Sequence, residues 1–345
     1  MKDEILVPDL QLKLKGVPPS VVKSLHADLV EVSVQQQLGL TTDFSLKFYT
    51  WDTQKVRYGW VDESTLKLGR EIEIRMGYVN QLERVMVGEV TDLELPFHAD
   101  EPPMLTVRGQ SKAHRLSRGD HTVVYHKKTD FEIARAIASR NQLRIDGDQT
   151  PIRYPYVLQA TITDLAFLNE RAEIAGASVN CDDGILRFEL VNKPPPAPRV
   201  LKAGLELISF TPRITSKGRV GAVKVIGISD DAKPLIHKET VKPNKPGTLN
   251  GDELYRGQVT VIQARELHTL EEVKARAEQE VERLRRSFVS ASGTCIGIPT
   301  LRPGQVVDVM NVGERFSGKY RLNSVTHSFS TTQGYRSSFD ATGEG

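Results

Sequence analysis

The stretch GQVVDVMNVGERFSGKYRLNSVTHSFS, residues 304–330, decides how the last third of the chain folds. Its centre, GERFSGKY (313–320), is one residue short of a phosphate-binding loop, because Tyr320 stands where a serine or threonine would hold magnesium. In such a loop a strand ends at glycines, and a helix begins directly afterwards with its N–H groups toward the phosphate. Here residues 320–330 alternate with period two, as the residues before the loop do. The stretch therefore predicts a β-hairpin with Gly318 in its turn, and no nucleotide site.

Strict alternation also predicts which side chains of this hairpin share a face. Residues two apart in a strand point to the same side of the sheet. Tyr320 and Leu322 are therefore expected on one face together with Ser324, and Val325 and His327 on the other.

The first third of the chain has the same alternation of apolar and polar residues. Six segments alternate apolar and polar residues and are separated by polar or Gly/Pro-bearing turns, which predicts strands. They are 10–16, 29–36, 43–51, 71–78, 84–95 and 104–111. A series of this kind predicts a closed or sandwiched antiparallel sheet, which we interpret as one small tube-like β-barrel over residues 1–118.

A compact α/β unit follows, predicted over residues 119–200. Thr129 and Glu132 have capping-box spacing at the start of a helix over 129–141. A second helix over 163–176 begins after Thr163 and ends at the glycine at 176, and residues 177–190 read as two strands around an Asp-Asp-Gly turn. The prolines of KPPPAP (193–198) end the unit, because they continue neither a helix nor a central strand.

The alternation typical of strands returns in residues 201–345, which we interpret as a second tube-like β-barrel. Segments 204–214 and 219–229 alternate, whereas 230–257 is rich in Pro, Gly and polar residues and is expected to be an exposed loop without a core element. Residues 269–288 predict an amphipathic helix with an apolar stripe. It is either a partner or coiled-coil helix or a surface helix packed on its own barrel, and packing on its own barrel is favoured. The fold class is therefore mainly β with an α/β insert, and the two β regions suggest an internal duplication without a residue-level repeat.

Composition excludes several classes of protein. The chain has 345 residues, of which 39% are hydrophobic and 26% charged, and 46 basic against 44 acidic groups give a net charge of +2. These values are ordinary for a globular protein and give no basic patch for nucleic acid. No segment approaches the roughly 18–20 apolar residues of a membrane span, no signal peptide is evident, and two cysteines form no disulfide framework.

The sequence shows no cluster of residues typical of a catalytic or metal site. His121 and His126 are the closest histidine pair, but five residues apart on a strand they face opposite sides. Cys295 lies in an apolar run, which is typical of a buried structural thiol, and Asp182 and Asp183 are explained by the turn at Gly184. We therefore predict no catalytic residue, no cofactor and no metal site, and a structural protein instead of an enzyme.

The C-terminal 40 residues resemble the closing barrel of the phage late control D family, the hub proteins of contractile tails and related injection systems. The shared features are a Pro-Gly strand, a hairpin with F-x-G-x-Y, a strand with V-x-H-x-F and a strand with G-Y-x-[ST]. The matching positions are Pro303 and Gly304, then Phe316, Gly318 and Tyr320, then Val325, His327 and Phe329, and finally Gly334, Tyr335 and Ser337. The paired helices and hairpin of residues 129–190 resemble the same family, as does the segment 111–119 leading out of the first barrel.

The resemblance implies a homotrimeric baseplate hub that joins the sixfold inner tube to the threefold central spike. Implied partners are a separate spike protein with an OB-fold and β-helix, inner tube or tube-initiator proteins, and baseplate wedge proteins. It implies neither nucleic-acid binding nor membrane insertion. A separate spike is expected because the sequence given stops at FDATGEG (339–345), unless the native chain continues. Such a subunit would be cytoplasmic during assembly and then part of a phage tail, tailocin or secretion particle. A cargo- or peptidoglycan-binding module of the same particle is the alternative.

Overall fold

The computed structural model describes residues 7–52, 57–97, 102–182, 184–191, 197–215, 220–229, 231–241, 257–264, 267–286 and 288–344. The chain divides into two compact units. The first consists of Met1–Lys193, Thr294–Gly304 and Ser324–Phe339, and the second of Pro194–Gly293, Gln305–Asn323 and Asp340–Gly345. Residues from the last third of the sequence thus belong to the same unit as the first third.

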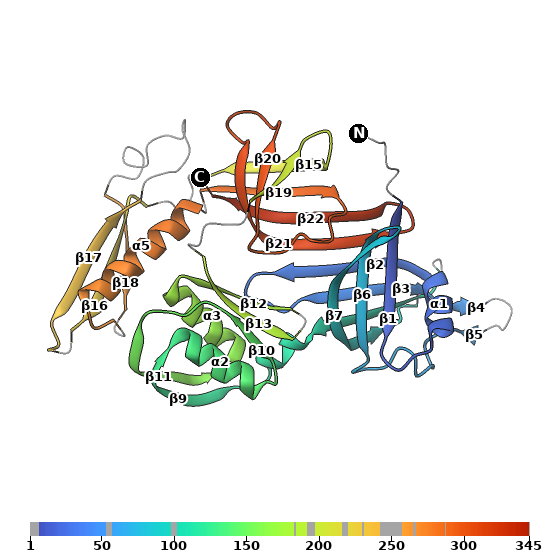
Figure 1. Ribbon diagram of the computed structural model, residues 1–345, viewed down its shortest axis with the longest axis horizontal. Helices are drawn as coiled ribbons and strands as arrows, with labels where there is room; N and C mark the ends of the chain where they lie inside the picture. The colour runs from blue at the N-terminus through green and yellow to red at the C-terminus, as the bar shows by residue number, and fades with distance from the viewer. Residues whose placement is uncertain are drawn as a thin grey trace. The chain divides into compact units, whose positions relative to one another are not determined.

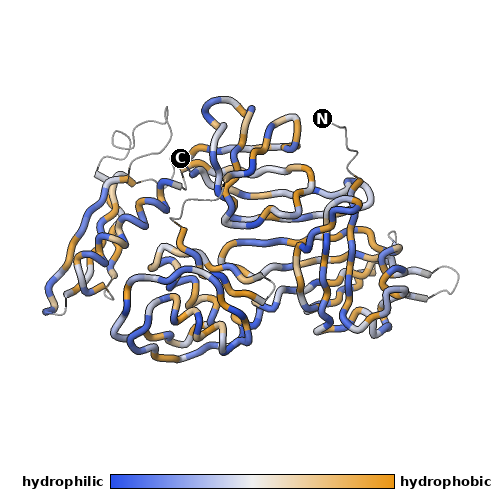
Figure 2. Tube along the Cα trace, viewed as in Figure 1, coloured by the Kyte–Doolittle hydropathy of each residue, from blue (hydrophilic) through white to orange (hydrophobic). Residues whose placement is uncertain are grey.

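The largest element is a sheet of 12 strands in the order β1-β6-β7-β8-β3-β2-β21-β22-β19-β15, with β14 and β20 attached beside β21 (Figure 1). Its strands are β1 (Pro8–Leu14), β2 (Leu29–Gln37), β3 (Asp43–Tyr49), β6 (Glu71–Tyr78), β7 (Gln81–Glu94), β8 (Met104–Ser111), β14 (Arg199–Lys202), β15 (Leu207–Ile214), β19 (Val289–Ile296), β20 (Val306–Met310), β21 (Gly318–Ser330) and β22 (Gly334–Gly343). All six strands predicted in the first third are present. Figure 2 shows the alternation of hydrophobic and hydrophilic residues along them.

The sheet is open and does not close into a barrel, with β1 at one end of the strand order and β15 at the other. Beside β1 lies helix α1 (Pro19–Ala27), which the alternation of the first third did not predict. Leu25 of α1 is fully buried in the core that β1, β2, β3, β6, β7 and β8 share, and Nε2 of His26 lies 3.0 Å from the carbonyl oxygen of Leu10. A helix therefore covers the edge of β1 where a closed barrel would have a strand pair.

The insert contains the predicted pair of helices. They are α2 (Asp130–Arg140) and α3 (Asp164–Ala175), together with the 3₁₀ helix η1 (Lys112–Ser117) and strands β9 (His121–Thr129), β10 (Arg144–Gly147), β11 (Arg153–Ile162), β12 (Ala177–Asp182) and β13 (Ile185–Leu190). The capping box is confirmed, because the N–H of Glu132 donates to Thr129 Oγ1 and the Glu132 carboxylate accepts from the N–H of Thr129. Thr163 caps α3, which ends at Gly176 in the left-handed conformation. The helices pack with β12 and β13 around a core of their own.

A small α/β sandwich belongs to the second unit. Strands β17 (Pro234–Thr240), β16 (Ala222–Ile228) and β18 (Val259–Gln263) form a three-stranded sheet, and helix α5 (Leu270–Arg286) packs on one face of it (Figure 1). The helix packs on its own chain, as favoured from its pattern, but on this small sheet and not on the strands of a barrel. The prediction that 230–257 holds no core element is wrong in its first part, because β17 pairs with β16 along seven residues and Leu235 packs against the core. Residues 242–256 lie outside the described part of the chain.

Strand β21 buries a different face in each of its two halves. Tyr320 and Leu322 are buried in the first half, and Val325 and His327 are buried in the second half, so the buried face changes between Leu322 and Val325. This change lies where the strand passes from the second unit to the first, at Asn323 and Ser324. The pairing of β21 with β20 and with β2 shows no bulge, so the prediction that these two pairs point to opposite sides agrees with the observed pairing.

The short hairpin of β4 (Trp51–Asp52) and β5 (Arg57–Tyr58) completes the strands of the first unit. The predicted division into 1–118, 119–200 and 201–345 stays a prediction, since the two units run across it.

Candidate functional site

The hairpin around GERFSGKY is confirmed. Strands β20 and β21 pair antiparallel, and Gly318 has a φ of 137°, a conformation in which a Cβ is strained. The hydroxyl of Tyr320 donates to the carbonyl of Phe316 at 2.6 Å, and its buried ring meets Phe210 edge-on at 5.3 Å. Burial raises the pKa of Tyr320 to about 12. The F-x-G-x-Y residues therefore hold a turn together, and no helix begins after the loop to receive a phosphate.

A second part of the motif forms a buried polar network within the first unit. His327 has no exposed surface; its Nδ1 lies 2.9 Å from the hydroxyl of Tyr335 and 3.2 Å from Ser337 Oγ, and its Nε2 lies 3.1 Å from the carbonyl oxygen of Leu301. Ser337 Oγ also accepts from the N–H of Ile298 at 2.9 Å. Burial, and secondarily the charge of Arg302, lower the pKa of His327 to about 3. The imidazole is therefore neutral, and it joins β21 and β22 to the loop before β20.

The network continues through Gly297. Its N–H donates to the carbonyl of Tyr335, and its carbonyl accepts from the hydroxyl of Tyr78 at 2.9 Å. A Cβ at Gly297 would overlap the ring of Tyr335. Tyr78 comes from β6, so the network links the first third of the sequence to the last. Its signal in the sequence was incomplete, because Gly297, Leu301 and Tyr78 belong to none of the motifs.

The other motif positions surround these groups. Gly304 has a φ of 87° in the turn before β20, and Gly334 has a φ of 67° at the start of β22. Phe329 packs partly buried against the core of the first unit, and Pro303 is buried. All eleven motif residues thus lie in turns or packed positions instead of a shared cleft.

A wide polar surface lies on the first unit, over strands from both ends of the sequence. We define the polar sheet face by two cross-strand rows whose side chains all point away from the core. The rows are Ser328-Ser33-Ser45-Arg108-Asp92 and Thr326-Gln35-Asp43-Gln110-Glu89. Every side chain in these rows is polar, and most carry a hydroxyl or amide. A stable protein interface has an apolar centre, so this face is suited to contact with water.

Internal contacts satisfy the charges of the polar sheet face. Arg108 pairs with Asp92 at 3.2 Å and with Glu94, and the amide of Gln110 donates to Asp43 at 2.9 Å. A shallow groove of about 350 Å³ runs over these residues. Since the ionic groups are already paired, the face offers no concentrated charge to a bound ligand.

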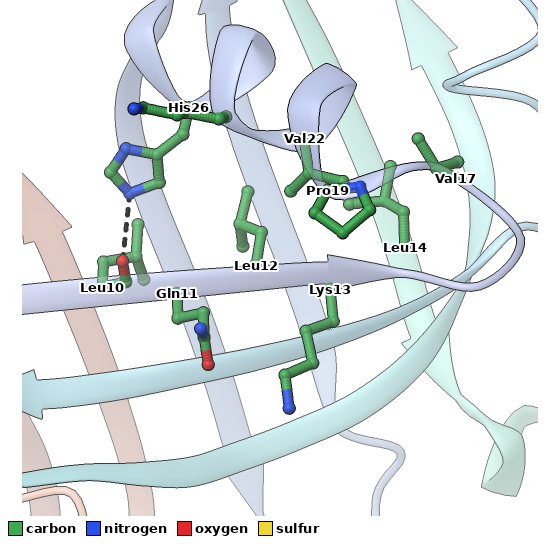
Figure 3. A pocket seen from close by; sticks show the side chains of 10 residues that line it. Leu10, Gln11, Leu12, Lys13, Leu14, Val17, Pro19, Val22 and His26 are labelled. Carbon is green, nitrogen blue, oxygen red and sulfur yellow. Dashed lines mark hydrogen bonds between the residues drawn. The ribbon is translucent and has the colours of Figure 1, made fainter.

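An apolar groove of about 530 Å³ lies between β1 and α1 (Figure 3). Leu12 and Leu14 point toward α1, while Gln11 and Lys13 lie on the other side of the strand (Figure 3). The groove follows the open edge of the sheet, where α1 replaces a strand. It contains one titratable ring, His26, which is held by the carbonyl of Leu10.

Comparisons with known proteins identify a family for the chain and, separately, its fold. The family model described as the Alg8 N-terminal domain matches residues 20–331. The chain belongs to the Alg8 N-terminal domain family. No curated protein matches it.

Solved structures show which fold this member of the Alg8 N-terminal domain family has. The 43 kDa tail protein of prophage MuSo2 from Shewanella oneidensis is 17% identical, with a TM-score of 0.72 and 98% of each chain covered. The tail protein from Neisseria meningitidis MC58 is 13% identical, with a TM-score of 0.73 over 98% of this chain and 97% of that one. The E. coli c3393 protein, a component of the type VI secretion system, is 14% identical, with a TM-score of 0.63 over 96% and 76%. The chain therefore has the fold of phage tail proteins and of this secretion component.

The other residues considered in the sequence as catalytic or metal-binding groups lie apart from one another in the structure. His121 Nε2 lies 3.8 Å from the buried carboxylate of Asp164, whereas His126 is exposed. Cys295 is buried, and its thiol donates to the carbonyl of Ser337 at 3.3 Å. Among the described residues no group of three or more His, Cys, Asp or Glu could hold a metal ion, and no described helix could span a membrane. Asp183 lies outside the described residues.

Gly318→Val is expected to destabilise the hairpin of β20 and β21. A Cβ at a φ of 137° costs about 1 kcal/mol or more, and the turn sets the register of β20 against β21. Thermal unfolding should show a lower midpoint than wild type. The control is Lys319→Ala at the neighbouring exposed position, which should leave the midpoint unchanged; titration calorimetry with ATP should show no binding to either protein. An unchanged midpoint in the valine variant would place the turn elsewhere.

His327 should make the free energy of unfolding of this chain dependent on pH. The unfolded imidazole has a pKa near 6.5 and the folded one about 3, so between these values the unfolded state binds the extra proton. Stability therefore falls as pH falls from 6.5, by at most about 1.4 kcal/mol per pH unit. Urea unfolding at pH 7 and pH 5 should show a loss of about 2 kcal/mol in wild type that His327→Gln lacks. Equal losses in both proteins would assign the pH dependence to other groups.

Proposed function

We propose that this chain is the structural baseplate hub of a contractile injection system or phage tail, a homotrimer that joins the sixfold inner tube to the threefold central spike. The fold of phage tail proteins supports a role in a tail or baseplate. The c3393 protein, which shares the fold, is described as similar to the T4 bacteriophage tail proteins gp27 and gp5. Each chain would supply two tube-like β regions, so three chains would present six near-equivalent positions to the tube.

The polar sheet face is the observation that carries the proposal. It extends across β7, β8, β3 and β2 and continues onto β21, so strands from the first and last thirds form one surface. A surface rich in hydroxyls and amides, without an apolar row and with its charges paired, fits a water-filled passage better than a protein interface. In the proposed ring this face lines the passage that continues the inner tube.

The partners of the proposed hub follow from its place in the particle. They are a separate spike protein, inner tube or tube-initiator proteins, and baseplate wedge proteins; the protein is assembled in the cytoplasm and then becomes part of the particle. The eleven motif residues, from Pro303 to Ser337, hold the β region that contacts these partners and take no part in chemistry. We propose no catalytic activity, cofactor or nucleic-acid contact.

Stoichiometry tests the trimer. The chain should be produced together with the spike protein encoded beside it and the complex weighed by native mass spectrometry. We expect three copies of this chain per three-chain spike, with large interfaces of about 2,000 Å² or more, as in obligate assemblies. One or two copies per complex would contradict the hub.

The α/β insert supports the alternative of a cargo- or peptidoglycan-binding module. On the outer side of β9 and β11, Val124 lies opposite Leu158 and His126 opposite Tyr156, and the side chains of Val124, Leu158 and Tyr156 are 47%, 48% and 66% exposed. An exposed apolar ribbon of this kind is typical of a binding surface. Cosedimentation with purified peptidoglycan, lost in a Tyr156→Ser/Leu158→Ser variant, would favour this function over the hub.

A further inference from the structure

The three-stranded sheet of β16, β17 and β18 has two apolar faces, of which α5 covers one. On the covered face, Val223 and Val225 of β16 are buried against Val273 and Ala277 of α5. These side chains, with those of Leu267 and Val281, form a closed core. This half of the sandwich is thus a complete helix-on-sheet layer.

The second face is as apolar as the first but has no covering layer among the described residues. Ile226 lies opposite Ile236, and Lys224 lies opposite Val261. Ile236 and Val261 are 50% and 52% exposed, and none of these side chains belongs to the core under α5. Branched aliphatic residues on all three strands make a contiguous patch, which in a globular protein is typical of an interaction site.

The charged side chains of this second face are all positive. Lys224 and Lys238 lie directly opposite each other on neighbouring strands, an arrangement that destabilises a sheet unless a counter-charge is supplied. No carboxylate within the described part of the chain forms an ion pair with either lysine. The only carboxylate on β17, that of Glu239, lies on the face toward α5 next to His237. The patch therefore lacks negative charge.

We propose that this second face, defined by Ile226, Ile236, Val261, Lys224 and Lys238, binds an amphipathic helix of another protein whose apolar stripe is flanked by carboxylates. A helix is the occupant because the same sheet already accepts α5 on its other face, with valines at the same alternating spacing. The carboxylates would neutralise the two lysines as the apolar stripe covers the isoleucines. The result would be a three-layer α/β/α sandwich completed by a partner. A second copy of this chain fits less well, because the apolar stripe of α5 is already buried and two such faces would bring four lysines together.

The experiment uses two synthetic helical peptides of 17 residues with identical leucine stripes. One carries glutamate on both flanks of the stripe and the other carries lysine. Binding of each labelled peptide to the full chain is measured by fluorescence anisotropy, and circular dichroism checks that each variant is folded. Sedimentation of the chain alone tests for self-association through the same face.

We expect the acidic peptide to bind the wild-type chain at least about tenfold more tightly than the basic one. Lys224→Glu/Lys238→Glu should invert this preference, Ile236→Asp should abolish binding of both peptides, and Lys319→Glu, outside the patch, should change neither. Binding of neither peptide, equal binding of both, or binding that survives Ile236→Asp would overturn the proposal. Self-association abolished by Ile236→Asp would also overturn it, in favour of a second copy. None of these results bears on the trimer, so the hub and this face are tested separately.

Discussion

Arg171→Met is expected to destabilise the α/β insert by about 3–5 kcal/mol, because it leaves the carboxylate of Asp130 buried without a counter-charge. The guanidinium of Arg171 donates to Asp130 Oδ1 at 2.6 Å, and the two side chains are 7% and 1% exposed. Burial raises the pKa of Asp130 and the neighbouring Arg171 opposes this shift, so the pair holds the carboxylate charged against its surroundings. The guanidinium also lies 4.5 Å from the ring centre of Tyr154, a contact that methionine keeps only in part.

Hydrogen exchange of the amides in α2 and α3 measures this effect locally, because Asp130 lies in α2 and Arg171 in α3. Asp130→Asn/Arg171→Met is the matched control, because it removes both charges and should recover most of the loss. If α2 and α3 in Arg171→Met exchanged as slowly as in wild type, the carboxylate would have another source of compensation.

Gly297→Ala is expected to lower the free energy of unfolding by about 3 kcal/mol, the second large effect. The added Cβ would overlap the ring of Tyr335, which is itself fixed by the hydroxyl contact with His327. Neither partner can move freely, because the carbonyl of Gly297 is bonded to Tyr78. The ring or the backbone must therefore shift, and the network of His327 with it.

Urea unfolding of Gly297→Ala should give a midpoint well below that of wild type. Gly59→Ala is the matched control, since the nearest atom to its added Cβ is 3.5 Å away and its φ is not in the left-handed region. Adding Tyr335→Leu to Gly297→Ala should recover part of the loss by making room. Equal stability of Gly297→Ala and Gly59→Ala would show that the close approach is not rigid.

The local parts of this fold could be predicted from the sequence. The capping box at Thr129 is a short-range signal, and it is formed as predicted. The same arrangement of Thr269 and Glu272 begins α5. The strands of the first third alternate cleanly because one face of each is buried in one core. Helix α1 was missed, because PSVVKSLHA is short and no side chain caps its N-terminus, unlike those of α2 and α3.

Features that depend on distant pairing were not predictable. Strand β17 has Pro234 at its start and polar residues along it, and it becomes a strand because β16 pairs with it. The change of buried face along β21 arises because the strand serves two units in succession. The polar sheet face exists only because β21 pairs with β2, almost 300 positions away in the numbering. The motif identified His327 and Tyr335, but not the glycine and carbonyls that complete their network.

The most direct test of the hub is an electron microscopy reconstruction of this chain bound to its spike protein. We predict a C3 ring in which each chain contributes two superposable β regions, with Ser33, Ser45 and Ser328 lining the central passage. A complex in which the two β regions do not superpose, or in which these serines lie on the outside of the ring, would contradict the proposal.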